Sequence, residues 1–251
     1  MISLTKQKWI RSLEQKKFRT EYGLFIAEGT KCCLDLLELL PCEFLAATEA
    51  WLEEYPQDSV KEVMQVSKEE IRKISMQKNP QEVLAIFCIP KYELPDLSNN
   101  QQLILVLDNI QDPGNLGTIL RIADWYGIDH VVCSIGTVDA YNPKTVQATM
   151  GAIGRVKIHY TNLETYLSTS KVPVYGTFLE GESLYDVPLS QNGLIVMGNE
   201  GNGISMDVGQ LVTQKLFIPD YPKGSTGSES LNVGAATAII CSEFRRRCQQ
   251  P

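Results

Sequence analysis

Polar side chains and glycines follow an apolar run at three places in the sequence, and each place could hold a ligand. The first segment spans Leu107 to Gly127 and reads LDNIQDPGNLGTILRIADWYG. Its proline and glycines predict a loop that lets backbone amides approach a ligand closely, followed by a helix that carries Arg121. A tight turn with an exposed helical arginine is the alternative interpretation.

The second segment, LIVMGNEGNGIS, delivers glycines and Glu200 from an apolar strand into a loop. The glycine order is G-x-x-G-x-G, whereas dinucleotide-binding loops use G-x-G-x-x-G with an acidic residue about 20 positions later. The segment therefore argues against a nucleotide-dependent oxidoreductase. Read alone, it also fits an ordinary glycine-rich turn.

The third segment, LFIPDYPKGSTGSESLNV, leads from a strand through a polar loop to Ser230, Leu231 and Asn232. The last helix of the chain begins at this point. Either Ser230 or Asn232 could simply cap that helix, because both types of side chain accept hydrogen bonds from the first free amides. A role in binding and a role in capping both stay open for them.

The elements that would position these segments alternate between strand and helix in two regions. In the first region Ser67 and Glu70 predict a capped helix start, and the stretch 89–102, IPKYELPDLSNNQQ, then concentrates turn-forming residues. A new alternation begins at LILVLDNI, a continuous apolar run suited to a parallel strand covered on both faces. We expect an α/β protein with domains at 1–95 and 103–251 and a linker at 96–102.

Composition excludes several classes of protein. The chain has 251 residues, 43% hydrophobic and 21% charged, and neither a cleavable leader nor a long apolar run, so we expect a cytoplasmic protein. Its seven cysteines form no C-x-x-C pair, and His130 and His159 are the only histidines. This set does not provide the ligands of a zinc site, and we expect no metal.

Basic residues are concentrated near the N-terminus of a chain whose net charge is −7. Residues 1–19 contain one acidic residue, Glu14, and six basic residues: Lys6, Lys8, Arg11, Lys16, Lys17 and Arg19. A second basic group is Arg245–Arg247. A solvated helix face, or cations at a helix end that face its dipole, explains either group, and phosphate binding is the alternative.

Taken together, the three segments resemble the three motifs of the SpoU/TrmH family of RNA ribose methyltransferases, in the same order and over residues 103–248. DPGNLGTILRIAD supplies Asn115, Gly117 and Arg121; GNEGNG is the second motif; and IP followed by SLNV is the third. Residues 1–95 are similar to the family's RNA-binding extension, through KKFRTEYGLFIAEG and NPQEVLAIF. The loop 220–229 is longer than is usual in the family, so no role is carried over to it.

The resemblance implies a C-terminal α/β trefoil-knot methyltransferase domain of the SPOUT type and a smaller N-terminal α/β domain that is ribosomal-protein-like and binds RNA. It implies S-adenosyl-L-methionine as cofactor and a ribose 2′-hydroxyl as methyl acceptor. Thr177, Gly198, Ile218 and Leu231 would line the cofactor pocket.

The resemblance also implies catalytic roles for five residues. A guanidinium stays protonated in proteins, so Arg121 would stabilise the forming alkoxide and hold the adjacent phosphate. Asn115, Asn232 and Ser230 would orient the ribose and the arginine. Glu200 would hold a ribose hydroxyl or pair with a cation.

Three expectations about partners follow. The family forms homodimers, so we expect a two-fold dimer. The basic residues Lys6, Lys8, Arg11, Lys16, Lys17 and Arg19 become the predicted RNA-binding set. Ribosomal RNA is the preferred substrate; transfer RNA, or a non-catalytic RNA-binding or ribosome-assembly role on the same fold, are the alternatives.

Overall fold

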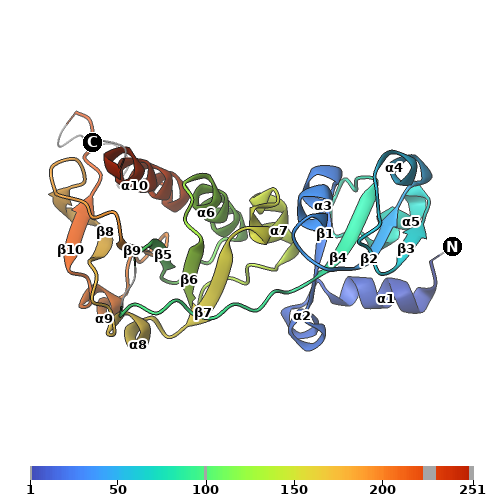
Figure 1. Cartoon of the computed structure of the whole chain (residues 1–251), viewed down its shortest axis with the longest axis horizontal. Coiled ribbons are helices and arrows are strands. Elements are labelled where there is room, and N and C mark those ends of the chain that lie inside the picture. The colour runs from blue at the N-terminus through green and yellow to red at the C-terminus, as the bar shows by residue number, and fades with distance from the viewer. Residues whose placement is uncertain (1, 99–100, 223–229, 249–251) are drawn as a thin grey trace. The chain divides into compact units, whose positions relative to one another are not determined.

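The computed structural model describes residues 2–98, 101–222 and 230–248, without the side chain of Cys248. The chain forms two compact units (Figure 1). The N-terminal unit comprises residues 1–91 and 139–155, and the C-terminal unit comprises residues 92–138 and 156–251. In the described residues no helix is long and apolar enough to cross a membrane.

The N-terminal unit is built on a four-stranded sheet in the order β1-β4-β2-β3. Its strands are β1 (Leu24–Glu28), β2 (Cys42–Ala47), β3 (Val63–Gln65) and β4 (Val83–Cys88). Strand β4 runs antiparallel to β1 and β2, whereas β2 and β3 are parallel. Its helices are α1 (Leu4–Ser12), α2 (Lys16–Tyr22), α3 (Thr30–Leu37), α4 (Glu49–Glu54), α5 (Lys68–Ile74) and α7 (Pro143–Thr149), with a 3₁₀ turn at Ala152–Gly154.

The start of α5 shows the predicted capping box. The Ser67 hydroxyl accepts from the Glu70 amide at 3.2 Å, and the Glu70 carboxylate accepts from the Ser67 amide at 3.0 Å. Glu70 also accepts from the amide of Ile2 at 2.8 Å. The bond from the Ser67 amide has the largest effect on the Glu70 carboxylate and the bond from the Ile2 amide the second largest. Together they lower the pKa of Glu70 to about 2. The cap thus also fastens the N-terminal segment.

Arg19 is buried in the N-terminal unit, with 2% of its surface exposed. Its guanidinium contacts the Asp139 carboxylate at 2.5 Å and donates at 2.7 Å to the carbonyls of Leu13 and Glu14. The N–H groups of the Arg19 guanidinium therefore bind partners inside the protein. Its predicted role in RNA binding is wrong. Its ion pair joins α2 to a segment that lies 120 residues further along the chain.

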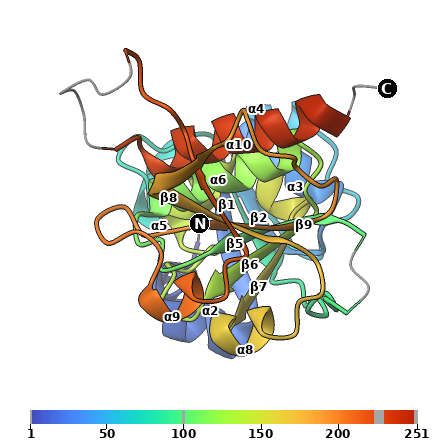
Figure 2. The same ribbon diagram turned by 90° about the vertical axis from the view of Figure 1, so that its left-hand side faces the viewer.

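The C-terminal unit is built on a six-stranded, wholly parallel sheet in the order β10-β8-β9-β5-β6-β7. Its strands are β5 (Leu103–Leu107), β6 (His130–Ser134), β7 (Lys157–Thr161), β8 (Val174–Ser183), β9 (Gly193–Met197) and β10 (Gln214–Phe217). Strands β5 and β9 are buried throughout. Helices α6 (Pro113–Trp125) and α10 (Val233–Cys248) cover one face of the sheet, and α8 (Leu163–Leu167) and α9 (Met206–Gly209) cover the other (Figure 2).

The predicted α/β class and parallel sheet are confirmed. The knot stays a prediction, because the connection from β10 to α10 includes residues 223–229, which lie outside the described residues. The domain ranges 1–95 and 103–251 also stay a prediction, although the compact units differ from them at residues 139–155. Within the predicted linker, Leu97 is 1% exposed and packs in the core of the C-terminal unit.

Two histidines pair across β6 and β7. Nδ1 of His130 lies 3.0 Å from Nε2 of His159, and their rings stack with centroids 5.2 Å apart. Burial lowers the pKa of His159 to about 4, with further lowering by His130 and Lys157. Burial also lowers the pKa of His130. The sheet therefore favours the neutral form of both rings.

Replacing Arg19 with methionine should lower the free energy of unfolding of the N-terminal unit by about 3–5 kcal/mol, because Asp139 would be left as an uncompensated charge. The measurement is urea unfolding followed by tryptophan fluorescence in a Trp125→Phe background, where only Trp9 and Trp51 report. Lys17→Met, an exposed change in the same helix, is the control. A loss below 1 kcal/mol would contradict the structural role.

The histidine pair predicts a pH dependence of stability. Because the folded pKa of His159 lies below the ordinary value of about 6.5, its stabilisation is present above that pH and is lost as pH falls toward 4. Urea midpoints of the C-terminal unit should therefore fall less steeply between pH 6.5 and 4 in His159→Gln than in the unchanged protein. An equally steep fall of the urea midpoint with pH in both proteins would contradict the prediction.

Candidate active site

The three motifs leave the sheet of the C-terminal unit at the same edge. The first follows β5, the second follows β9 and the third follows β10, and all three strands are parallel. The carboxyl ends of parallel strands lie at one edge, which is where ligands bind in open α/β sheets. Sequence segments as distant as 115 and 232 can therefore contribute to one site.

Asn115 connects all three motifs by hydrogen bonds. Its amide nitrogen donates to Oε1 of Glu200 at 2.9 Å, and its amide oxygen accepts from Nδ2 of Asn232 at 3.0 Å. We call these three residues the Asn115 cluster. Glu200 and Asn232 are exposed and Asn115 is half-buried, so the cluster faces solvent and can meet a large substrate.

Asn232 both caps a helix and belongs to the cluster. Its Oδ1 accepts from the amides of Gly234 at 2.9 Å and Ala235 at 3.3 Å, at the start of α10. The two interpretations left open for Asn232 therefore hold together, because its oxygen caps and its nitrogen reaches Asn115. Ser230 is exposed and makes no hydrogen bond within the described residues, so capping does not occupy its hydroxyl.

Helix α6 carries both Asn115 and Arg121. Asp112 caps the helix by accepting from the Asn115 amide at 2.8 Å, and Pro113 takes the first helical turn. Arg121 is exposed and has no partner among the described residues. It lies six residues beyond Asn115, roughly 9 Å along the axis. Six residues turn the helix by about 600°, so Arg121 also lies about 120° around the axis from Asn115. No hydrogen bond joins it to the Asn115 cluster within the described residues.

The GNEGNG loop is a tight turn fixed by its own backbone and by Asn199. The amides of Asn199 and Gly203 donate to each other's carbonyls at 2.9 Å. A Cβ on Gly198 would lie 2.3 Å from the Gly203 carbonyl carbon, so no side chain fits there. Gly198 is therefore required by the turn itself. Its predicted contact with the cofactor stays a prediction.

Asn199 holds this turn against the first motif, a role that the sequence reasoning missed. Its Oδ1 accepts from the amides of Gly201 at 2.9 Å and Asn202 at 3.0 Å, and its Nδ2 donates to the Asn109 carbonyl at 2.8 Å. The preference of asparagine for bonding to the backbone two residues further on was the available signal. These bonds fix the loop that presents Glu200.

Asp108 makes a second connection between the same two loops. It is 5% exposed, and its Oδ2 accepts from the Ser205 amide at 2.7 Å. Ser205 directly precedes α9, so the end of β5 is tied to the segment that follows the second motif. Sequence analysis did not single out Asp108, because a carboxylate at a strand end gives no indication of its partner.

The predicted cofactor residues lie within β8, directly after β9 and β10, or beside the Asn115 cluster. Thr177 is in β8 and its hydroxyl donates to the Val196 carbonyl at 3.2 Å. Ile218 directly follows β10 and is half-buried, and Leu231 is 53% exposed next to Asn232. An uncovered apolar side chain beside a polar cluster fits a ligand with an apolar base and a polar tail, as S-adenosyl-L-methionine has.

Some of the basic residues predicted to bind RNA have partners within the N-terminal unit, and others are exposed to solvent. Lys6 pairs with Glu62 at 2.6 Å, and Arg11 donates to the Lys73 carbonyl at 3.2 Å. Lys8 and Lys17 are exposed and make no ion pair with described residues. Lys16 is exposed as well. With Arg19 excluded, these five residues keep their predicted role.

The second basic group serves the structure of the C-terminal unit. Arg245 donates at 2.7 Å to the carbonyls of Tyr126 and Gly127, where α6 ends. Arg246 and Arg247 donate to Glu243 and lower its pKa to about 2, Arg246 having the larger effect. The solvated-face interpretation holds for Arg246, which is exposed and bonds only within α10, but not for Arg245 and Arg247, which donate to carbonyls outside that helix.

Two family descriptions match the chain. The SpoU rRNA Methylase family matches residues 102–242, and the MRM3-like substrate binding domain matches residues 5–85. Together they cover both regions that the sequence analysis separated.

Individual relatives match over almost the whole chain. The 23S rRNA (guanosine(2553)-2′-O)-methyltransferase RlmP of Bacillus subtilis is 31% identical, with 94% of each chain covered. A TrmH-family RNA methyltransferase structure from Porphyromonas gingivalis is 41% identical, covers 98% of this chain and 99% of its own, and has a TM-score of 0.88. An AdoMet-bound rRNA methyltransferase from Sinorhizobium meliloti is 30% identical, with 100% and 98% covered and a TM-score of 0.83.

Asn199→Ala should loosen the second motif, because it removes three hydrogen bonds of about 0.5–1.5 kcal/mol each. We expect faster hydrogen exchange at the Gly201 and Asn202 amides and about tenfold or greater weakening of S-adenosyl-L-methionine binding, measured by calorimetry. Asn202→Ala is the matched control, since its side chain makes no hydrogen bond with described residues. Equal effects in both variants would refute the positioning role.

Proposed function

The chain belongs to the SpoU rRNA Methylase family, and from this premise we propose that it methylates a ribose 2′-hydroxyl of ribosomal RNA. It is an S-adenosyl-L-methionine-dependent RNA methyltransferase in this proposal. The observation that carries it is the Asn115 cluster, in which hydrogen bonds of 2.9 and 3.0 Å bring the three family motifs to one exposed point. A protein that had lost catalysis would have no need to keep these motif residues together.

The residues of the site match the requirements of methyl transfer to a hydroxyl. The bound cofactor supplies an electrophilic methyl group on a sulfonium. The protein must then align a weakly nucleophilic oxygen and stabilise its developing negative charge. Arg121 carries a permanent positive charge and is unpaired within the described residues, so it is available for the oxygen and the neighbouring phosphate.

The Asn115 cluster orients the ribose in this proposal. Asn115 fixes one oxygen of Glu200 and leaves the other free to accept from a sugar hydroxyl. Ser230 adds a hydroxyl with no partner among the described residues. Ile218 and Leu231 would cover the adenine of the cofactor, while Thr177 within β8 and Gly198 directly after β9 would lie beside it.

Ribosomal RNA is favoured over transfer RNA as the substrate. The relatives from Bacillus subtilis and Sinorhizobium meliloti are both named as rRNA methyltransferases and match nearly the whole chain, including the N-terminal unit. The exposed residues Lys8 and Lys17 of that unit would contact RNA phosphates. Transfer RNA is the second candidate and is the comparison substrate of the test.

A two-fold dimer and a cytoplasmic location are part of the proposal. The small residues of α10 would allow a second subunit to pack closely against this helix. Some of them, however, already pack against α6 within the same unit. A Cβ on Gly234 would lie 3.1 Å from the Thr118 side chain of α6, and Gly234 is buried. A dimer would therefore use other parts of α6 and α10. Sedimentation equilibrium tests this part independently.

Methylation is tested with labelled S-adenosyl-L-methionine and purified ribosomal RNA or transfer RNA. Digestion to nucleosides and mass spectrometry should detect a 2′-O-methyl nucleoside in ribosomal RNA. Base methylation alone would overturn the ribose assignment, and modification of transfer RNA alone would overturn the substrate assignment.

Arg121→Ala should lower kcat by about 10²–10³-fold, the usual effect of removing one donor to a developing oxyanion. Its affinity for S-adenosyl-L-methionine should stay within about twofold, because the role acts on the acceptor oxygen. Single-turnover methylation gives the rate and calorimetry gives the affinity. Equal loss of rate and affinity would place Arg121 in cofactor binding instead.

A further inference from the structure

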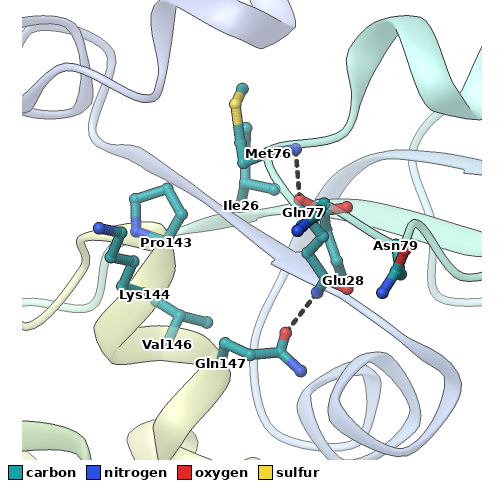
Figure 3. A pocket seen from close by; sticks show the side chains of 10 residues that line it. Ile26, Glu28, Met76, Gln77, Asn79, Pro143, Lys144, Val146 and Gln147 are labelled. Atoms are coloured by element: carbon teal, nitrogen blue, oxygen red, sulfur yellow. Dashed lines mark hydrogen bonds between the residues drawn. The ribbon is translucent and has the colours of Figure 1, made fainter. Parts of the chain in front are cut away.

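A pocket of about 400 Å³ opens in the N-terminal unit, between β1, the segment after α5 and α7 (Figure 3). This volume is within the range of about 300–1,000 Å³ that small-molecule pockets occupy. All the residues that line it belong to the N-terminal unit. The Asn115 cluster and Arg121 belong to the other unit, so the proposed methyl transfer does not account for this pocket.

The lining combines apolar surface with amide groups. Ile26, Met76, Pro143 and Val146 form the apolar part, and Gln77 and Gln147 meet in a hydrogen bond at the pocket (Figure 3). Apolar surface suits the faces of a planar ring. Amides suit its polar edge, because each amide offers both a donor and an acceptor.

The amide oxygen of Gln77 and the amide nitrogen of Gln147 take no part in the hydrogen bond between the two side chains. Nε2 of Gln77 donates to Oε1 of Gln147 at 2.5 Å. No described group bonds to Oε1 of Gln77 or Nε2 of Gln147. The bonded pair therefore keeps an amide oxygen as acceptor and an amide nitrogen as donor, the two kinds of group that the hydrogen-bonding edge of an unpaired nucleobase requires.

Glu28 forms a fixed wall of the pocket. It is 5% exposed, its Oε1 accepts from the Met76 amide at 2.8 Å, and its Oε2 accepts from the Ser75 hydroxyl. Burial raises the pKa of Glu28 despite these bonds. Because both oxygens are engaged inside the protein, Glu28 holds the segment after α5 in place and is not an open ligand for a cation.

Two lysine side chains lie at the pocket. Lys78 and Lys144 line it, both are exposed, and neither makes an ion pair with described residues. An unpaired lysine beside a pocket with this lining suits a phosphate group. The lining as a whole therefore matches a nucleotide, with a base against the apolar part and a phosphate at the lysines.

We propose that this pocket binds one unstacked nucleotide from a single-stranded part of the substrate RNA. The inference rests on the proposed function and deepens it, since it gives the N-terminal unit a base-reading site in addition to phosphate contacts. Base edges in an RNA duplex are not available to such a pocket, whereas unpaired bases in loops and bulges are. A purely electrostatic surface would show no preference among bases.

The test measures binding of fluorescent ten-nucleotide RNAs to the full chain by anisotropy. The probes are oligo-A, oligo-C, oligo-U and a fully paired duplex. The unchanged protein should bind one single-stranded probe about fivefold or more tightly than the duplex. Gln147→Leu should remove most of that preference, because it deletes the free donor while keeping the side-chain size.

Two further variants distinguish base recognition from charge. Lys144→Gln should weaken binding of all probes by a similar factor. It should also reduce the slope of log Kd against log salt concentration by about one. Gln65→Leu, at an exposed position of β3 outside the pocket, should change nothing. Thermal melts of all variants establish that they are folded.

Failure of this proposal is distinguishable from failure of the proposed function. If Gln147→Leu keeps the base preference and the KM for ribosomal RNA of the unchanged protein, the pocket proposal is overturned, while methyl transfer stands. If the preference depends on Gln147 but no RNA is methylated, the proposed function fails and the pocket stands. A duplex bound as tightly as every single strand also overturns the pocket proposal.

Discussion

The candidate active site depends on a single amide side chain that bonds in two directions. Asn115 donates to Glu200 and accepts from Asn232, so one residue fixes the relative positions of three loops. The two partners lie 85 and 117 residues further along the chain. Each loop is also held by its own bonds: Asp112 caps α6, Asn199 closes the second motif and Asn232 caps α10. The site is therefore organised before any ligand arrives.

The parallel sheet makes this arrangement possible. Strands β5 and β9 are buried along their whole length, so their register is fixed by packing on both faces. Their ends cannot shift without exposing apolar residues, and the loops inherit that rigidity. Burial of Asp108 adds a further constraint, because its hydrogen bond to the Ser205 amide ties the first loop to the segment beyond the second.

Sequence patterns predicted what depends on local spacing. The Ser67–Glu70 cap, the buried runs of β5 and β9 and the grouping of the three motifs all follow from neighbouring residues or from the family resemblance. Partners distant in the sequence were not predictable. Arg19 looked like one of six equivalent cations until its pairing with Asp139 was visible, and Asn199 and Asp108 gave no indication of what they hold. Residues 139–155 likewise joined the N-terminal unit through contacts that no local pattern encodes.

Helices α6 and α10 are fastened at both of their ends. Near the motifs, Asn232 bonds to Asn115, and at the far end Arg245 binds the last carbonyls of α6. Two helices that are hydrogen-bonded to each other near both ends resist sliding and rotation better than helices joined only through side-chain packing. A substitution near residue 245 would therefore be transmitted to the pair of asparagines along the helix axes.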